Sequence, residues 1–487
     1  MLECTSIAAP AAHGGSCLCH SPAFAKLAAR FDARVSRRSF LAGGLGAAGS
    51  ALSAGPAAAR IPAAPATPVA FTNIRLFDGR GDALRSGLRV VVEGDRIRSV
   101  EPADRPQAAG LQIVDGGGRT LMPGLIDAHW HAMMCALPLL QLVTADVGYI
   151  NLVAAEEAER TLMRGFTSVR DLAGPSFGLK RAIDGGIVAG PRIWPSGAMI
   201  SQTGGHGDFR LPWEVPAAPA APLSRGDVIG GGAIADGVER VLQRAREQLM
   251  LGASQLKLAA GGGVSSNYDP IDVAQYTEAE FRAAVDAAEN WGTYVTVHAY
   301  TPRAIQTAIR AGVKCIDHGQ LMDETTARMM ADKGIWLSIQ PFVENEFANV
   351  QSNPLNQAKQ REVFAGTDRA YGYAKKYGLK TAWGTDLLFE PRNTANQGGI
   401  LASMVRWYTP AEVLRMATST NAELLAMSGP RSPYPAKVGT IEPGAHADLL
   451  VIDGDPLTDL KLIADPERTL SVIMKDGRFF RNRLAKG

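Results

Sequence analysis

The sequence predicts an α/β fold: a (β/α)8 TIM barrel that carries a small β-sandwich domain built from both chain ends. Three observations lead to this prediction. Short apolar runs alternate with amphipathic helical stretches eight times over roughly 300 residues, as in repeated βαβ units. Strand-like runs broken by Gly-Asp turns flank this region on both sides. The composition, 46% hydrophobic and 20% charged, is that of a globular protein.

Eight strand candidates define the barrel, and the helices between them have recognisable starts. The strand candidates are residues 125–131, 167–172, 192–197, 254–260, 294–300, 314–319, 335–341 and 380–386. Thr277 with Glu280, and Thr409 with Glu412, each form a capping-box pattern ahead of an apolar run. Eight repeats favour a closed TIM barrel, and a doubly wound open sheet is the alternative.

Four segments make up the predicted domain organisation. The first and last parts of the small β domain contain matching strand-like runs, such as Val69–Phe77 and Ser471–Arg478, and we expect them to pair. The segments are a leader at 1–66, the first part of the β-sandwich at 67–121, the barrel at 122–435 and the second part of the β-sandwich at 436–487.

The leader resembles a bacterial twin-arginine export signal. Residues 36–41 read Ser-Arg-Arg-Ser-Phe-Leu and precede a weakly apolar Gly/Ala stretch with small-x-small cleavage sites. A low-complexity extension is the alternative. The apolar stretch is too short and glycine-rich for a membrane span, and no later segment qualifies as one. We expect the twin-arginine machinery as a partner and a periplasmic or secreted mature chain.

Charge and cysteine content exclude several classes of protein. The net charge is +2, and once the six basic and two acidic residues of the first sixty are set aside, 44 basic residues face 46 acidic ones. A nearly neutral body argues against nucleic-acid and membrane partners. Only Cys135 and Cys315 follow the leader, which is too few for a disulfide framework but leaves one bridge open.

Candidate metal ligands stand at the ends of five predicted strands. In a TIM barrel these ends meet at one mouth, and residues i and i+2 share a strand face, so the side chains should converge. Imidazole with carboxylate suits zinc, manganese, iron or nickel, and a set without cysteine argues against a structural thiolate site. We therefore expect an open catalytic metal site. The candidates are His129, His131, Lys257, His298, His318 and Asp386.

Lys257 is the unusual member of this set. A protonated ammonium between apolar neighbours and beside metal cations is strongly disfavoured. Reaction with carbon dioxide would convert the amine into an anionic carbamate that bridges two cations, and this change of charge makes the position sensible. The alternative is a lysine at the edge of the core that pairs with an acid.

With these residues in place, the chain resembles the amidohydrolase superfamily, binuclear-metal subtype. The resemblance implies that His129 and His131 bind the more buried of two divalent ions, which we expect to be Zn²⁺. His298 and His318 would then bind the more exposed ion. The motifs span residues 68 to 480 and are Leu121–His131, Lys257, Val297–Ala299, Ile316–Gly319, Gly384–Asp386 and Gly439–Leu449.

The resemblance also implies the chemistry of the site. Lys257 would bridge the ions as a carbamate, and Asp386 would bind metal while acting as general base and then as general acid. Two cations lower the pKa of a bridging water and hold hydroxide beside the scissile carbonyl. His206, in a Gly-flanked loop, is a candidate for stabilising the oxyanion, with a structural role as the alternative.

Three further motifs resemble the prolidase-like and ochratoxinase-like branch of carboxypeptidases and dipeptidases, which is related to imidazolonepropionase. For a substrate carboxylate, Arg210 and Tyr268 are the candidates, because a guanidinium binds a carboxylate bidentately; solvated loop positions are the alternative. We expect Trp130 to belong to the packing and His446 to lie at the surface or in a turn. The motifs are Gly204–Asp208, Lys257–Val264 and Gln275–Glu280.

The predicted function is hydrolysis of an amide bond with release of a C-terminal amino acid from a dipeptide or N-acyl amino acid. Amides resembling ochratoxin fall in this class. Hydrolysis of a cyclic amide or carbamate, as in imidazolone chemistry, is the alternative within the superfamily. A metal-free scaffold protein is the alternative from another class, and all six filled ligand positions argue against it. We expect a homo-oligomer.

Overall fold

The computed structural model describes residues 61–106, 109–215, 222–349, 351 and 353–485. The twin-arginine pattern at residues 36–41 lies outside the described residues, so the export signal stays a prediction. Among the helices of the described ranges, none has the length and apolar character needed to cross a membrane.

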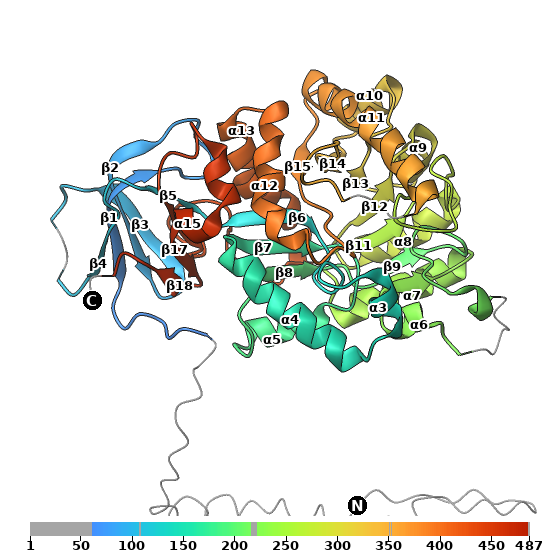
Figure 1. Ribbon diagram of the computed structural model, residues 1–487, viewed down its shortest axis with the longest axis horizontal. Coiled ribbons are helices and arrows are strands. Elements are labelled where there is room, and N and C mark those ends of the chain that lie inside the picture. Colours follow the sequence, from blue (N-terminus) through green and yellow to red (C-terminus); the bar gives the residue numbers. More distant parts are fainter. Residues whose placement is uncertain (1–60, 107–108, 216–221, 350, 352, 486–487) are drawn as a thin grey trace, which may run out of the picture. The chain divides into compact units, whose positions relative to one another are not determined.

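All eight predicted barrel strands are present, and hydrogen-bonded neighbours run parallel (Figure 1). Ser254 N donates to Pro195 O at 2.7 Å and Asp386 N donates to His129 O at 2.8 Å, which joins the two remaining edges. The TIM-barrel prediction is therefore confirmed. The strands are β6 (Leu125–Trp130), β7 (Phe166–Asp171), β8 (Arg192–Pro195), β11 (Leu256–Ala259), β12 (Val295–Ala299), β13 (Cys315–His318), β14 (Trp336–Ile339) and β15 (Thr381–Trp383).

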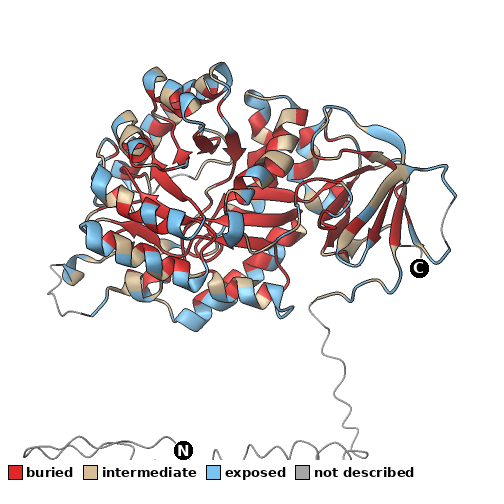
Figure 2. Ribbon diagram, turned by 180° about the vertical axis from the view of Figure 1, so that it is seen from behind, coloured by how far each residue is buried: buried red, intermediate tan, exposed pale blue. Residues whose placement is uncertain are grey.

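Helices cover the outside of the barrel, with buried faces turned inward and exposed faces outward (Figure 2). The predicted capping boxes of α8 and α13 are both formed, at Thr277 and Thr409. Two short strands, β9 (Met199–Ser201) and β10 (Gly232–Ile234), extend the sheet beside β11. The helices are α3 (Leu139–Thr144), α4 (Val147–Met163), α5 (Phe177–Asp184), α6 (Arg225–Val228), α7 (Val238–Leu251), α8 (Glu278–Asn290), α9 (Pro302–Arg310), α10 (Glu324–Asp332), α11 (Pro354–Lys376), α12 (Gln397–Ala402), α13 (Pro410–Arg415), α14 (Asn421–Ala426) and α15 (Pro466–Thr469).

The two ends of the body pair into one eight-stranded sheet, as the sequence predicts. β16 from the C-terminal part joins β5 from the N-terminal part in antiparallel register. The predicted boundary at 121 falls inside β5, which ends one residue before Gly124 and the start of the barrel. The strands are β1 (Val69–Leu76), β2 (Arg85–Glu93), β3 (Arg96–Pro102), β4 (Gln112–Asp115), β5 (Thr120–Pro123), β16 (Leu449–Ile452), β17 (Leu470–Lys475) and β18 (Arg478–Asn482).

This sheet curls over its own apolar core. β1 and β18 are separated by three strands in the sheet order, yet the rings of Phe71 and Phe479 lie 6.3 Å apart. The enclosed core includes Val90 and Val451, which come from opposite ends of the sequence. The small domain therefore depends on both chain ends for its hydrophobic burial.

The interpretation of His446 as a surface or turn residue is wrong. Only 5% of its surface is exposed, and its Nδ1 accepts from Arg192 Nη2 at 2.9 Å and from Arg96 Nη1 at 2.6 Å. Arg192 belongs to the barrel strand β8 and also donates to Asp448 at 3.0 Å. His446 is thus part of a buried polar network that joins the barrel to the β domain.

Two other core predictions have clear outcomes. Trp130 is buried, as expected, and the Arg164 guanidinium lies 5.9 Å from its ring centroid. Cys135 and Cys315 are buried free thiols, so the bridge that the sequence left open does not form.

Candidate active site

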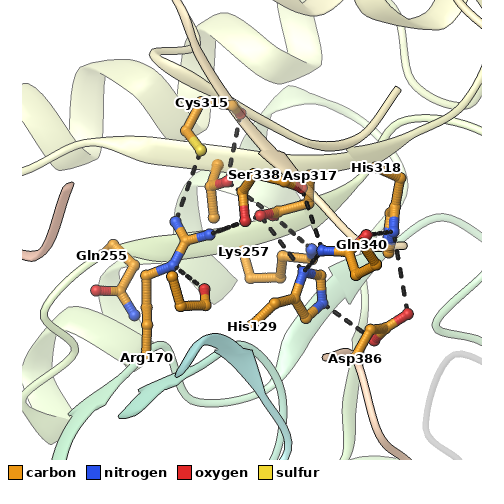
Figure 3. Close-up of polar contacts among 12 residues, drawn as sticks. His129, Arg170, Gln255, Lys257, Cys315, Asp317, His318, Ser338, Gln340 and Asp386 are labelled. Carbon is orange, nitrogen blue, oxygen red and sulfur yellow. Dashed lines mark hydrogen bonds and ion pairs between the residues drawn. The ribbon is translucent and has the colours of Figure 1, made fainter. Parts of the chain in front are cut away.

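Six predicted ligands from five strands gather at the carboxyl ends of the barrel strands. Asp386, just after β15, lies between two imidazoles: its Oδ1 is 3.1 Å from His129 Nε2 (Figure 3) and 2.9 Å from His131 Nε2. The i, i+2 spacing of these histidines therefore directs both toward one carboxylate, as the strand geometry requires.

The other two histidines complete the cluster. The ring of His318 lies 4.9 Å from that of His129 and 4.4 Å from that of His298, measured between centroids. Donor atoms of His129, His318 and Asp386 all lie within 4.8 Å of one another. Residues as far apart in the sequence as His129 and Asp386 thus form one compact group of ligands.

Two members of the cluster have a strained backbone. His318 has φ of 83° and Asp386 has φ of 55°, in a region that residues other than glycine rarely adopt. Such strain persists only where the surrounding structure imposes it, and it gathers at functional sites. Here it directs both side chains toward the same point.

Burial sets the protonation of the histidines. It lowers the pKa of His129 to about 4, even though Asp386 lies beside it. It also lowers the pKa of His298 and His318 well below 6.5. For Asp386, burial alone would raise the pKa, but His129 and the neighbouring imidazoles hold it well below its usual range. His129, His298 and His318 are therefore neutral imidazoles and Asp386 is an ionised carboxylate at neutral pH.

Lys257 lies in the same cavity and pairs with an acid. Its Nζ donates to Asp317 Oδ2 at 2.6 Å, and the fully buried Arg170 donates to Asp317 Oδ1 at 2.7 Å (Figure 3). Burial would raise the pKa of Asp317, but Lys257 and Arg170 hold it well below its usual range. Lys257 is thus paired with an acid, the alternative that the sequence left open, and it also lines the same cavity as the ligand histidines.

Two buried side chains that sequence reasoning missed hold the ligands in place. Gln340 lies between two rings, with Nε2 3.1 Å from His129 Nδ1 and Oε1 2.7 Å from His318 Nδ1. Asp127 accepts from His129 N at 3.0 Å, Thr385 N at 3.1 Å and Thr385 Oγ1 at 2.7 Å. Asp127 thereby joins the end of β6 to the segment that carries Asp386.

Tyr300 is a further residue that the sequence reasoning missed. It stands two residues after His298, lines the cavity, and its ring centroid is 5.0 Å from those of His298 and His318. Burial raises the pKa of its hydroxyl well above 10, so the phenol keeps its proton and can donate it in a hydrogen bond. Its i, i+2 spacing from His298, directly after the end of β12, was the available signal.

His206 is brought to the site. Its ring stacks on His298 with centroids 3.9 Å apart, and its Nδ1 lies 2.8 Å from Ser266 Oγ. Its backbone N donates to Gln275 Oε1 at 3.0 Å. The loop after β11 therefore fixes the orientation of this histidine at the cavity wall.

Arg210 and Tyr268, the predicted carboxylate ligands, do not line the cavity. The Arg210 guanidinium donates to both carboxylate oxygens of Asp208, at 2.8 and 2.5 Å. The Tyr268 hydroxyl donates to Arg210 O at 2.6 Å. The Arg210 guanidinium, which the sequence predicts to bind a substrate carboxylate, is thus already paired with an acid two residues away.

The cluster opens into a cavity of about 350 Å³, which is the size of a small-molecule site. Its donor set suits a pair of divalent ions: four imidazoles, the ionised carboxylate of Asp386 and Lys257 in the same cavity. His131 Nδ1 is also a buried nitrogen that finds no hydrogen-bond partner among the described residues. The residues present therefore fit a catalytic metal centre.

Known proteins resemble this chain in sequence and in fold. Residues 120–479 match the amidohydrolase family. An ochratoxinase from Aspergillus niger is 31% identical over 437 residues, which cover 83% of this chain and 85% of the relative. A crystal structure of an amidohydrolase is 36% identical, with a TM-score of 0.79, over 86% of this chain and all of the other. A prolidase crystallised with N-methylphosphonate-L-proline is 36% identical, with a TM-score of 0.78, over 85% of this chain and all of the other.

Family membership and the geometry of the site agree. The family generally uses a binuclear metal centre, and the cluster at the barrel mouth supplies donors for one. The chain belongs to the amidohydrolase family, in its ochratoxinase-like and prolidase-like branch, and is a hydrolytic enzyme that acts on carbon–nitrogen bonds.

Proposed function

We propose that this enzyme uses two zinc ions to cleave an amide bond and to release the C-terminal amino acid of a dipeptide or N-acyl amino acid. One observation carries the proposal: four imidazoles, Asp386 and Lys257 gather in one cavity that is large enough for such a substrate. When bound, the two cations polarise the scissile carbonyl and lower the pKa of the attacking water.

Asp386 has the position and charge of a proton carrier in this reaction. Its carboxylate is ionised and faces the ligand cluster, so it can take the proton of the attacking water and deliver it to the departing amine. Lys257, as a carbamate formed when its neutral amine adds carbon dioxide and loses a proton, would supply the two remaining ligand oxygens.

Two hydrogen-bond donors flank the cluster. Tyr300 keeps its phenolic proton, and His206 stacks over His298 at the cavity wall. Both are placed to donate to an oxyanion that develops on the substrate carbonyl. His206 follows β9 and Tyr300 follows β12, and both line the same cavity as the ligand histidines.

The substrate class draws on chemistry as well as on geometry. The prolidase relative was crystallised with a tetrahedral phosphonate joined to the nitrogen of proline. Such a group resembles the tetrahedral species formed when water attacks an N-acyl amino acid. A second relative is named as an ochratoxinase, and amides that resemble ochratoxin belong to the same proposed class of substrates.

Metal analysis and a substrate panel test the proposal. We expect about two equivalents of zinc per chain, and turnover of N-acyl amino acids and dipeptides above that of lactams. Asp386→Asn should lower kcat by about 10³-fold while the zinc content stays measurable. Asp104→Asn, at an exposed acid of the β domain, is the matched control and should be fully active. Turnover of lactams alone would contradict the proposal.

The carbamate has its own test. Protein grown and assayed with ¹³C-bicarbonate should give one carbamate carbon signal, and Lys257→Met should lose both this signal and the second zinc equivalent. A zinc-loaded, active wild type without that signal would contradict the modification.

We also propose that the chain is exported through the twin-arginine pathway and assembles as a homo-oligomer. Replacing Arg37 and Arg38 by Lys should keep the protein in the cytoplasm of a bacterial host, and light scattering should give a mass above that of one chain. Export of the double variant, or a monomer mass, would contradict the respective part.

A further inference from the structure

A second, smaller cavity adjoins the cavity of the active site, and we call it the side cavity. Its volume is about 30 Å³, and it lies beneath α3 and the start of α4. Apolar side chains from these helices and from the segment before β10 form its walls, including Leu142, Val143, Ile150 and Ile229. Among its described lining residues, Asn151 is the one with a polar side chain.

The side cavity and the active-site cavity share four lining residues. Met134, Leu139, Phe209 and Phe389 line both spaces. The rings of Phe209 and Phe389 meet edge to face, with centroids 6.1 Å apart. Because rotation of these side chains needs no change in the barrel, the two spaces can merge without loss of the fold.

Phe389 holds this place at the expense of backbone strain. Its φ is 59°, and its backbone N donates to Met134 O at 3.0 Å. A large aromatic residue in this conformation is uncommon, and such strain points to a functional position. Phe389 lies three residues after Asp386, so one side chain shared by the two cavities belongs to the segment that carries the proposed base.

The charge distribution selects the kind of group that the side cavity accepts. Among the described residues that line the active-site cavity, Lys257 is the one Lys or Arg, and the acids are Asp386 and Glu390. None of these three lines the side cavity. A charged group placed there would lose its hydration without gaining a partner, whereas an apolar group would gain from burial.

We propose that the side cavity is the subsite for an apolar group of the substrate, with Phe209 and Phe389 as its adjustable wall. The inference rests on the proposed function and deepens it: the preferred substrates carry an aliphatic or aromatic side group on one side of the amide. Discrimination between large and small groups then arises at α3, at the start of α4 and in the segment before β10, and none of the six proposed metal ligands lines the side cavity.

Gly231 allows a test that leaves the ligands untouched. It lines the side cavity, is not in the left-handed region, and a Cβ built on it would meet only Met134 Cε at 3.4 Å and more distant atoms. Gly231→Leu therefore places a large apolar side chain in the side cavity. Gly178→Leu is the matched control, because Gly178 is exposed on α5 and a Cβ there meets nothing within 4 Å.

We expect Gly231→Leu to lower kcat/KM at least about tenfold for N-acyl amino acids with large apolar groups and to leave the smallest substrates within about twofold. Ile229→Ala, which enlarges the side cavity, should shift the preference toward larger groups. Acyl and amino-acid series are varied separately, so the series that responds identifies the half of the substrate involved. A uniform effect of Gly231→Leu on large and small substrates would overturn the inference.

A binding measurement separates this inference from the proposed function. N-methylphosphonyl derivatives of glycine, leucine and phenylalanine, together with N-hexylphosphonyl-glycine, are titrated into zinc-loaded protein without any need for turnover. Gly231→Leu should weaken binding of the analogues with large groups about tenfold and spare that of the glycine analogue. If the analogues bind with this size selectivity but the N-acyl amino acids are not hydrolysed, the proposed function is wrong and the subsite stands. Hydrolysis or binding without size selectivity, or no binding at all, would remove the subsite.

Discussion

Acidification should destabilise the protein through His446. Burial, together with the nearby Arg192 and Arg96 guanidinium groups, lowers the pKa of this imidazole to about 4. In the unfolded chain the pKa returns to about 6.5. Between these two values the unfolded state binds a proton that the folded state excludes, so the free energy of unfolding falls as the pH falls from about 7 toward 4.

The magnitude follows from the two pKa values. At pH 5 the unfolded imidazole is almost fully protonated and the folded one almost neutral, which corresponds to about 2 kcal/mol less unfolding free energy than at pH 8. For a folded body of roughly 400 residues, the entropy of unfolding gives about 1 kcal/mol per degree. The expected contribution of His446 is therefore about 2 °C in Tm.

His446→Gln isolates this contribution. The amide oxygen of Gln can accept from the same guanidinium groups but does not titrate. Calorimetry of the zinc-loaded wild type and variant at pH 8 and pH 5, at one ionic strength, gives four Tm values. The wild type should lose about 2 °C more than the variant on acidification, because all other groups are shared.

Equal losses in the two proteins would refute this reasoning. Such a result would mean that His446 protonates in the folded protein near its ordinary pKa. The network that joins Arg192, Asp448 and His446 would then be open to water in solution, in conflict with the burial of this imidazole.

Three further predictions concern the active site. Tyr300→Phe should lower kcat about 10²-fold with Tm unchanged, as measured by steady-state kinetics and calorimetry, since one oxyanion donor is lost; full activity would exclude that role. Asp127→Ala leaves buried donors of His129 and Thr385 without a partner, so we expect a loss of about 4 kcal/mol, a Tm lower by about 4 °C and weaker zinc binding. Chelation of zinc should abolish turnover and lower Tm by a few degrees, about 4 kcal/mol for ions present at a thousandfold excess over Kd, and zinc with bicarbonate should restore both; unchanged activity in the chelated protein would contradict a metal-dependent reaction.

The predictable part of the site follows from local pattern. Strand periodicity and the convergence of strand ends in a barrel place His129, His131, His298, His318 and Asp386 together, and the structure agrees. The same rule also covers residues that the sequence reasoning passed over. Gln340 is the last residue but one of the seventh predicted strand, and Tyr300 ends the fifth, two residues after His298. They were missed because neither residue type is a usual metal ligand.

Other positions depend on partners that are distant in sequence. Asp317 stands beside the ligand His318, but its pairing with Lys257 and Arg170 depends on which face of β13 turns inward. The Gly-Ala-His-Ala-Asp context of His446 is typical of a turn, yet Arg192, 254 residues away, covers the imidazole. The residues next to His446 in the sequence carry no information on which distant side chain buries its imidazole.

By itself, the sequence determined the barrel, the pairing of the chain ends and the cluster of metal ligands, because these follow from hydrophobic periodicity and strand-end geometry. Only the tertiary structure decided which charges are already paired and which side chains face the cavity. In the folded protein Arg210 pairs with Asp208 instead of being free for substrate. His446 is buried, and the rings of Phe209 and Phe389 lie together beside the active-site cavity. The physical reason is that burial and the choice of partner are set by packing between distant segments, and packing decides how each polar group is satisfied.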